Sequence, residues 1–267
     1  MLRHLFAAMT LFIATQSHAT TIAPNAQISQ LFAQAKANGT LVVYDVSKQE
    51  FSGHNPQRAA TRFSPASTFK IANSLIGLAS GAVADVDEAL YHYDGKEQLY
   101  LDSWEQDTSL RTAIKVSHLP AYQLLARKIG LPQMQSNLNK MGYGNGKIGK
   151  SVETFWLDDS LKISAIEQTQ FLAQLAQGRL PFPAQVQADV REIAKLETGK
   201  NWTLYGKTGW TGQRQPSTGW FVGWVEQDGR IYSFALNMQM PKVSTASDLQ
   251  LRIDLAKAGL RTMGLMP

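Results

Sequence analysis

The sequence predicts an α/β fold in which a discontinuous antiparallel sheet, flanked by helices, packs against an all-helical part. Strand patterns occur near the N-terminus and again in the last quarter of the chain, and a long stretch of helical patterns separates them. Such an order of strands, helices and strands favours one sheet to which the chain returns after the helices. We therefore expect one domain over residues 20–267, with its α/β part at about 20–66 and 201–267 and its helical part at about 67–200.

The N-terminal strands are predicted from the apolar run Thr40–Asp45 and from the stretch near Glu50–Gly53, which turns back beside it. In the last third, Trp202–Tyr205 leads into a Lys-Thr-Gly sequence that we place on an edge strand, and Gly219–Glu226 follows as a strand rich in aromatic residues. These strands would form the two ends of the discontinuous sheet.

A hairpin is predicted next, because Asp228-Gly229 suits a tight turn between two strands. From Tyr232 to Met238, large apolar residues alternate with Ser233, Ala235 and Asn237. This alternation predicts a strand that is buried on one face only.

Four helices are predicted from apolar spacing and from residues typical of helix ends. They span Ser67–Ser80, a segment opened by Pro120 and ended by Gly130, a segment that follows the capping box at Ser164 and ends at Gly178, and residues 247–263. In the last of these helices, Leu251, Leu255 and Ala258 form the expected buried stripe.

Residues 1–19 are typical of a secretory signal peptide. Arg3 precedes the apolar stretch Leu5–Thr15, and Ser17-His18-Ala19 has the small residues of a cleavage site. We expect a mature chain that begins at Thr20, is secreted across the inner membrane to the periplasm and has no stable membrane anchor.

Composition excludes several classes of function. The chain has no cysteine, which excludes thiol catalysis and thiolate metal sites. Its formal net charge of +5 comes without a cluster of Lys or Arg residues, so no nucleic acid partner is expected. A mild positive charge favours an anionic small substrate.

Two short motifs indicate the chemistry. Ser67-Thr68-Phe69-Lys70 puts a nucleophile and a base three residues apart, on one face of a helical turn. A lysine takes a proton from serine only when it is neutral, which burial favours. The amide of Ser67 lies in the first turn, where free N–H groups can hold an oxyanion. Lys207-Thr208-Gly209 would place a cation and a hydroxyl opposite this turn.

Other catalytic chemistries lack their motifs. A serine–histidine–aspartate triad would need one of His54, His92 and His118, and no Gly-x-Ser-x-Gly sequence accompanies them. His118 is interpreted as a structural or surface residue without a direct chemical role. No His-Glu-x-x-His sequence occurs, and the Gly-x-Gly-x-x-Gly spacing at Gly144–Gly149 follows no predicted strand, so neither a metal nor a dinucleotide is expected.

With its motifs in this order, the chain resembles the class D β-lactamases, the oxacillinases, from about Phe63 to Arg252. This resemblance implies the β-lactamase/transpeptidase-like fold and the hydrolysis of β-lactam antibiotics through a serine acyl-enzyme. Further segments that match family motifs are Ser117, Tyr143-Gly144-Asn145, Phe155-Trp156-Leu157, Gly219–Trp224 and Leu251-Arg252.

The resemblance also implies the role of each site residue. Lys70 would react with carbon dioxide to give N6-carboxylysine, a carbamate that serves as general base, and no other cofactor is implied. The implied catalytic residues are Ser67, Lys70, Ser117, Trp156 and Lys207. The implied substrate-binding residues are Thr208, Gly209, Trp210, Arg252, Leu119 and Leu157.

One position departs from the family pattern, in which a valine follows the loop serine at the second position. This chain has Ser117-His118-Leu119, and the larger Leu119 would crowd the pocket of the modified lysine or shift the deacylating water. Ordinary packing at a helix start is the alternative.

Two other classes remain open from the sequence. A β-lactam sensor acylates without turnover, and a penicillin-binding peptidase acts on cell-wall peptides. Sensors are anchored by transmembrane segments and such peptidases commonly carry extra domains, and neither feature is found in this sequence. The preferred β-lactams and the formation of a homodimer are not determined by the sequence.

Overall fold

The structure is a computed structural model that describes residues 20–212 and 215–267, so the predicted signal peptide lies outside the described residues. The strands are β1 (Ile22–Pro24), β2 (Gly39–Asp45), β3 (Glu50–His54), β4 (Lys195–Thr198), β5 (Trp202–Trp210), β6 (Ser217–Gln227) and β7 (Arg230–Met240). The α-helices are α1 (Ala26–Gln34), α2 (Pro56–Ala60), α3 (Lys70–Ala79), α4 (Leu110–Lys115), α5 (Leu119–Ile129), α6 (Leu131–Met141), α7 (Ala165–Ala176), α8 (Ala184–Ile193) and α9 (Ala246–Thr262), and the 3₁₀ helices are η1 (Ala66–Phe69) and η2 (Asp102–Trp104).

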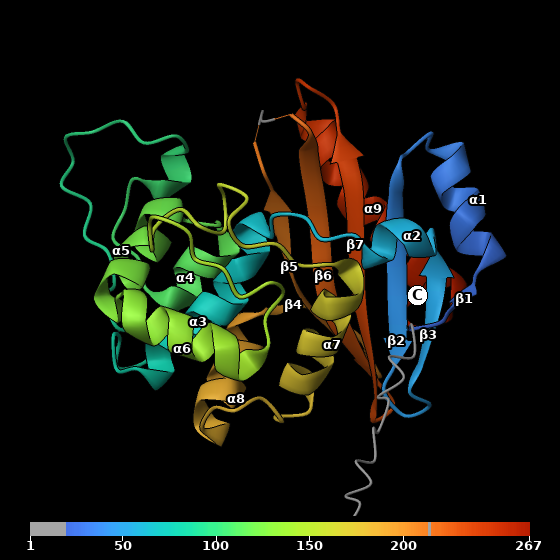
Figure 1. Cartoon of the computed structure of the whole chain (residues 1–267), viewed down its shortest axis with the longest axis horizontal. Coiled ribbons are helices and arrows are strands. Elements are labelled where there is room, and N and C mark those ends of the chain that lie inside the picture. The colour runs from blue at the N-terminus through green and yellow to red at the C-terminus, as the bar shows by residue number, and fades with distance from the viewer. Residues whose placement is uncertain (1–19, 213–214) are drawn as a thin grey trace, which may run out of the picture.

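The predicted discontinuous sheet is confirmed. One seven-stranded sheet has the order β1-β3-β2-β7-β6-β5-β4, so the N-terminal strands join the C-terminal hairpin where β2 pairs with β7. Every neighbouring pair is antiparallel except β1 with β3, which is parallel. The helical part lies beside the β5 side of this sheet (Figure 1).

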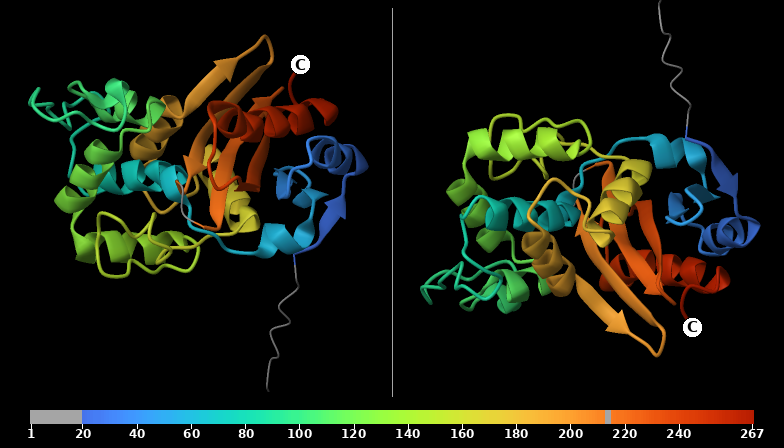
Figure 2. Two further views of the ribbon diagram at one scale, coloured as in Figure 1. Left: turned by 90° about the horizontal axis from the view of Figure 1, so that it is seen from above. Right: turned by 90° about the horizontal axis from the view of Figure 1, so that it is seen from below.

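The prediction that the last strand is half-buried is wrong. Ser233, Ala235 and Asn237 are all fully buried, like the apolar residues between them. The reason is that α7 covers this face of the sheet while α1 and α9 cover the other (Figure 2). Ser233 meets its hydrogen-bonding need by donating to the Thr169 carbonyl of α7 at 2.8 Å.

The closing helix occurs as predicted, but its buried stripe is different. The residues that α9 buries are Arg252, Leu255, Ala256, Gly259 and Leu260, whereas the predicted Leu251 and Ala258 are only partly covered. A methyl group at Gly259 would lie 2.3 Å from Leu41 Cδ2, so the helix packs directly on β2 at this point. Compared with the predicted stripe, α9 is rotated about its axis so that Arg252 faces the sheet.

The starts and ends of the other predicted helices are mostly confirmed. The capping box of Ser164 and Glu167 begins α7, and Gly130, with φ 75°, ends α5. The predicted helix from Ser67 differs in its first turn, which is the 3₁₀ helix η1, and α3 begins only at Lys70. Nearly every residue of α3 is buried, because this helix is surrounded by the rest of the helical part.

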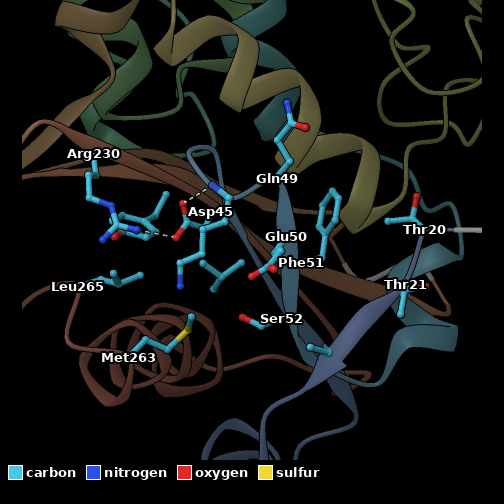
Figure 3. A pocket seen from close by; sticks show the side chains of 14 residues that line it. Thr20, Thr21, Asp45, Gln49, Glu50, Phe51, Ser52, Arg230, Met263 and Leu265 are labelled. Atoms are coloured by element: carbon cyan, nitrogen blue, oxygen red, sulfur yellow. Dashed lines mark hydrogen bonds and ion pairs between the residues drawn. The ribbon is translucent and has the colours of Figure 1, made fainter.

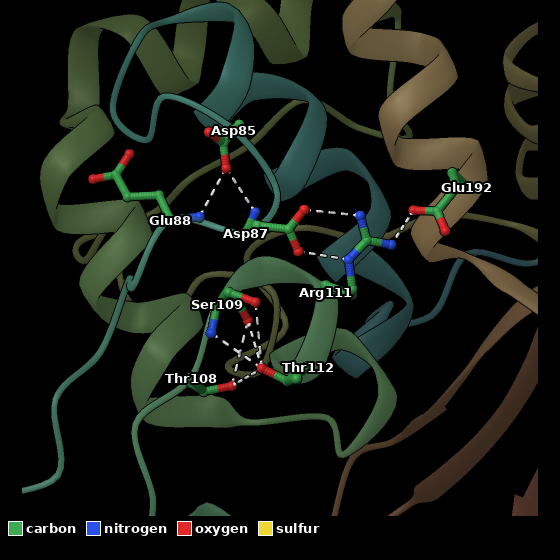
Figure 4. A network of polar contacts seen from close by, with 8 residues as sticks. All are labelled: Asp85, Asp87, Glu88, Thr108, Ser109, Arg111, Thr112 and Glu192. Carbon is green, nitrogen blue, oxygen red and sulfur yellow. Dashed lines mark hydrogen bonds and ion pairs between the residues drawn. The ribbon is translucent and has the colours of Figure 1, made fainter.

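A polar network fixes the loop that precedes α4 (Figure 4). Arg111 binds Asp87 through Nε at 2.6 Å and Nη2 at 3.0 Å, and it also contacts Glu192 of α8. A capping box of Ser109 and Thr112 begins α4. Exposed ion pairs add about 0–1 kcal/mol each, so the network chiefly positions the loop. Among the described residues, no helix has the length and apolar character that crossing a bilayer requires.

Candidate active site

The turn between η1 and α3 brings a serine hydroxyl and a lysine amine together. Lys70 Nζ lies 3.0 Å from Ser67 Oγ, and the lysine side chain is 1% exposed. Burial lowers the pKa of Lys70 well below its usual value, and the nearby Lys207 cation lowers it further. A neutral amine at this distance can accept the serine proton, so the predicted pairing of nucleophile and base is present in the structure.

The backbone of this turn is strained at Ala66, which has φ 48°. A non-glycine residue in the left-handed region costs on the order of 1 kcal/mol and needs support from its surroundings. Support comes from the Ala66 N–H, which donates to the Trp156 carbonyl at 3.0 Å. The same carbonyl accepts a hydrogen bond from Ser64 Oγ at 2.9 Å. The segment of Trp156 therefore holds the backbone that leads into the turn from Ser67 to Lys70, which is called the nucleophile turn below.

The Lys-Thr-Gly sequence lies on β5, which is not an edge strand by position, because β4 lies outside it. However, β4 pairs only with the first half of β5, as far as Tyr205. The stretch from Lys207 to Trp210 is therefore open on that side. The prediction of an edge strand is wrong for β5 as a whole, and it is correct for the half of β5 that carries the Lys-Thr-Gly sequence.

The pairing of β5 with β6 determines where the Trp210 amide points. Thr211 N donates to Thr218 O at 3.1 Å, directly opposite it in the register of the two strands. In an antiparallel pair, bonded and non-bonded positions alternate along each strand. The N–H of Trp210, one position earlier, is therefore turned away from β6 and toward the open side, as an oxyanion donor requires.

Gly209 allows β5 to approach the nucleophile turn. A methyl group at this position would lie 2.9 Å from the Pro65 carbonyl oxygen and 3.0 Å from Thr68 Cγ2. No larger residue fits without a shift of the backbone that precedes Ser67. Gly209 therefore acts through close packing.

Replacing Gly209 by alanine is expected to destabilise the fold by about 1–3 kcal/mol, as overpacking does, and to slow covalent modification of Ser67. Urea unfolding and the rate of serine modification measure the two effects. Gly77→Ala is the control for overpacking away from this turn, because its added carbon would lie 2.8 Å from Leu125 Cδ1. It should cost stability without slowing the modification of Ser67. If Gly209→Ala reacts at the wild-type rate, β5 does not constrain the turn.

Two buried cations lie next to each other at the open half of β5. Lys207 is 6% exposed and its Nζ donates to the Thr208 carbonyl at 3.1 Å. Burial, together with the Arg252 cation, lowers the pKa of Lys207 to about 7. Arg252 Nη1 donates to the Gly209 carbonyl at 2.9 Å, and burial lowers the pKa of Arg252 to about 10. Its Nε has no hydrogen-bond partner within the described part of the chain.

Neither cation forms an ion pair within the part of the chain that the structure describes. Unpaired buried charge is unfavourable, and a bound anion relieves it. An arginine fork suits a carboxylate in particular. The open half of β5 is thus prepared for an anionic group, which would also return Lys207 to its charged form.

Trp156 provides a free donor beside the nucleophile turn. Its ring is 1% exposed and stacks on Phe69, the residue before Lys70, with centroids 5.5 Å apart. Its indole Nε1 is buried and has no hydrogen-bond partner among the residues that the structure describes. Because buried N–H groups are nearly always bonded, this one points to an acceptor that the protein itself does not supply.

The remaining predicted residues lie at the start of α5 and near Trp156. Ser117 is partly buried with φ 55°, and its hydroxyl makes no hydrogen bond to Ser67 or Lys70 among the described contacts. Leu119 is the first residue of α5, and Leu157 follows Trp156; both pack partly buried against the core. Thr208 lies opposite Phe221 in β6 and is partly buried.

Sequence reasoning missed Tyr122. Its ring lies 5.1 Å from Lys70 Nζ, and its hydroxyl is 2.9 Å from Ser74 Oγ. Burial raises the pKa of Tyr122, so the ring is a neutral wall of the lysine pocket. Its position in α5, three residues after Leu119, was the only available signal.

A second region of the surface is also hollowed. A cavity of about 840 Å³ lies away from this site, where Arg230 pairs with Asp45 near Met263 and Leu265 (Figure 3). A smaller cavity of about 440 Å³ reaches Lys207 and Thr208 along the open half of β5. Side-chain chemistry, and not cavity size, identifies the site.

Three comparisons with known proteins show what the chain is similar to. The family model described as "Penicillin binding protein transpeptidase domain" matches residues 31–259. The chain is 38% identical to Beta-lactamase OXA-48 of Klebsiella pneumoniae, over 88% of this chain and 87% of that protein. It is 37% identical to Beta-lactamase OXA-5 of Pseudomonas aeruginosa, over 87% of this chain and 88% of the other.

Solved structures give the same result. The crystal structure of FUS-1 (OXA-85), a class D β-lactamase from Fusobacterium nucleatum subsp. polymorphum, superposes with a TM-score of 0.87 and 44% identity, covering 91% of this chain and 100% of that one. The class D β-lactamase YbXI from Nostoc superposes with a TM-score of 0.86 and 36% identity, at the same coverage.

Proposed function

Because this chain belongs to the class D β-lactamases, which are serine hydrolases, we propose that it opens β-lactams by a serine acyl-enzyme in which carbamylated Lys70 is the general base. The observation that carries the proposal is the buried Lys70, with its Nζ 3.0 Å from Ser67 Oγ, beside an indole N–H without a partner.

In acylation, Ser67 Oγ attacks the lactam carbonyl and transfers its proton to the base on Lys70. The oxyanion that forms on the carbonyl oxygen accepts hydrogen bonds from the amides of Ser67 and Trp210. A pair of preset backbone donors is the usual solution for such an intermediate, and each donor contributes roughly 3–4 kcal/mol to the transition state.

Collapse of the intermediate breaks the carbon–nitrogen bond, and the lactam nitrogen needs a proton. Ser117 is proposed to pass it from the base, with the positive charge of Lys207 favouring transfer. An anionic substrate raises the pKa of Lys207 from about 7, because an opposite charge stabilises the ammonium. Binding of the substrate would thereby supply the charge that this step uses.

In deacylation the base on Lys70 acts a second time. It takes a proton from water, which attacks the ester of Ser67. The acyl carbon–Oγ bond then breaks, the base returns the proton to Ser67 Oγ, and the opened lactam is released as a carboxylic acid. The side chain of Leu119, larger than the valine of the family motif, is proposed to limit the room for this water, and packing at the helix start is the alternative. The rate of deacylation in Leu119→Val distinguishes the two.

Two features support the carbamate. Only a neutral lysine reacts with carbon dioxide, and the pKa of Lys70 is lowered by burial and by Lys207. The product is an anion that needs a hydrogen-bond donor, and the unpartnered Nε1–H of Trp156 can provide one. Carbon dioxide or bicarbonate would be the only co-reactant.

Arg252→Ala is expected to weaken transition-state binding of an ordinary β-lactam by about 2–3 kcal/mol, the cost of losing a charged hydrogen bond. Most of this loss should disappear with a substrate whose carboxylate is esterified, as measured by kcat/KM for both. Arg252→Lys keeps the charge and removes the fork, so it should lose less. An equal loss on both substrates would make Arg252 a structural residue, consistent with its bond to Gly209 O.

One assay distinguishes this enzyme from related proteins. Rapid turnover of a penicillin, with an acyl-enzyme seen by mass spectrometry in the first turnover, is expected of a hydrolase. Acylation that stops after one equivalent would indicate a sensor, and cleavage of a cell-wall peptide would indicate a peptidase. Secretion to the periplasm after cleavage at Ala19 is also proposed, and N-terminal sequencing of the exported protein tests it.

A further inference from the structure

Trp104 binds both neighbours of Ser117. Its indole Nε1 donates to the Val116 carbonyl at 3.0 Å, and its own carbonyl lies 3.0 Å from His118 Nε2. The Trp104 and His118 rings also stack, with centroids 5.6 Å apart and planes inclined by 30°. The residue enclosed between the two hydrogen bonds is Ser117.

These contacts define the state of the His118 ring. A carbonyl only accepts, so Nε2 carries the hydrogen that binds Trp104 O. Ala121 N donates to Nδ1 at 3.1 Å, so Nδ1 is bare. His118 is therefore neutral, in the Nε2–H form, and its ring is the N-cap of α5.

Ser117 needs such support because its φ is 55°. A left-handed serine persists only where its surroundings hold it. Its own N–H donates to Ile114 O at a long 3.3 Å, and the next N–H, of His118, donates to Ala113 O at 2.9 Å. The shorter bonds that fix this turn are thus made by Trp104 and His118.

The ring is enclosed and neutral. His118 is fully buried, with Tyr91 on one side at a centroid distance of 4.8 Å. Of the titratable groups described, Tyr91 from the loop packs on the ring and Lys70 from α3 acts on its charge. The ring accepts from the Ala121 N–H of α5, and the His118 backbone N–H donates to the Ala113 carbonyl of α4. Burial lowers the pKa of His118, the bond to Trp104 opposes this shift, and Lys70 adds to it.

We propose that His118 is a positioning residue of the reaction, which in its neutral form binds Trp104, caps α5 and so holds the Ser117 hydroxyl in place for proton transfer. This inference rests on the proposed role of Ser117. His118 does not touch the substrate and acts only through the conformation of its neighbour.

Protonation at Nδ1 would undo the arrangement. The ring could no longer accept from Ala121 N, and a positive charge at a helix N-terminus is unfavourable. Because the folded pKa lies below the ordinary value of about 6.5, the stabilisation is complete above that pH. It is lost as the pH falls through the folded pKa.

A double-mutant cycle tests the coupling. His118→Ala should slow acylation by a penicillin about tenfold or more, since a misplacement of 1 Å can cost ~100-fold. In a Ser117→Ala background the same change should cost less than about twofold, because residues that act together are not additive. If His118→Ala slows acylation by the same factor in both backgrounds, the two losses are independent and the inference is overturned. If Ser117→Ala alone acylates normally, the proposed proton transfer fails instead.

Matched substitutions separate the two bonds of the ring. His118→Asn places an acceptor where Nδ1 lies and keeps the cap, whereas His118→Gln places an N–H where Nε2 lies and keeps the bond to Trp104 O. Both variants should acylate faster than His118→Ala. Because asparagine is not protonated in this range, His118→Asn should also remove the part of the loss of acylation rate at acid pH that protonation of His118 causes. His92→Asn is the control, because His92 is exposed and pairs with Asp107.

Nitrogen-15 NMR of the histidine rings in the wild-type enzyme gives a readout independent of activity. His118 should appear as the Nε2–H tautomer and should stay neutral to a pH below the ordinary histidine pKa of about 6.5. Observation of the Nδ1–H tautomer, or protonation of His118 at or above that ordinary value, would contradict the proposal.

Discussion

Ser67→Ala is expected to abolish covalent labelling by a fluorescent penicillin and to remove all measurable turnover. Ser67 is the one serine in the described chain whose hydroxyl is hydrogen-bonded to a buried lysine amine, at 3.0 Å. Without this oxygen no acyl-enzyme can form, and catalysis through a nucleophile is lost altogether. Gel fluorescence and intact-protein mass spectrometry measure the label.

Ser80→Ala is the matched control for this experiment. Ser80 ends the same helix, and its hydroxyl only donates to the Gly77 carbonyl, so labelling should be unchanged. Labelling of Ser67→Ala at the wild-type extent would rule out Ser67 as the nucleophile. The structure would then offer no second serine paired with a lysine among the described residues.

Lys70→Ala is expected to slow both halves of the reaction, each by about 100- to 10,000-fold, the usual contribution of a general base. The proposed mechanism gives deacylation no second base, so the acyl-enzyme that forms slowly should persist. Stopped-flow labelling measures acylation, and mass spectrometry after removal of free penicillin measures deacylation.

The Lys70 variant needs a check on folding, because its side chain is fully buried. Removing a buried amine whose ionised form is unfavourable should leave stability nearly unchanged or increase it, apart from the cavity it leaves. The exposed Lys147→Ala is the control for both kinetics and melting temperature. A Lys70→Ala enzyme that deacylates at the wild-type rate would show that another group activates water.

Local sequence signals correctly predicted the helix ends and the turn that they mark. Glycine and proline at helix ends, the capping box at Ser164 and the Asp228-Gly229 turn act over a few residues, and the structure has each of them. The order of strands and helices also predicted that the two strand regions meet, since no other arrangement buries both.

The errors arose from packing between distant elements. Alternation in β7 predicted one buried face, but a sequence does not show that α7 and α9 cover opposite faces. The buried stripe of α9 was misplaced because an arginine lies within it, and burial of Arg252 depends on the Gly209 carbonyl that accepts its hydrogen bond. Helical spacing alone assigns arginine to solvent.

The site shows the same division. The three-residue spacing of Ser67 and Lys70 was sufficient to predict their contact, because it depends on one helical turn. Tyr122 and Trp104 reach the site from other segments, and their residue types are those of ordinary core residues. Contacts of this kind become visible only when the chain has folded.

The central claim, that Lys70 carries a carbamate held by Trp156, is tested most directly by carbon-13 NMR with labelled bicarbonate. The account predicts a single lysine carbamate resonance in active enzyme, absent from Lys70→Ala and lost at a higher pH in Trp156→Phe, which removes only the indole N–H. Bicarbonate should restore turnover in carbon dioxide-depleted buffer in parallel with this resonance. Active enzyme without any carbamate resonance would contradict the account.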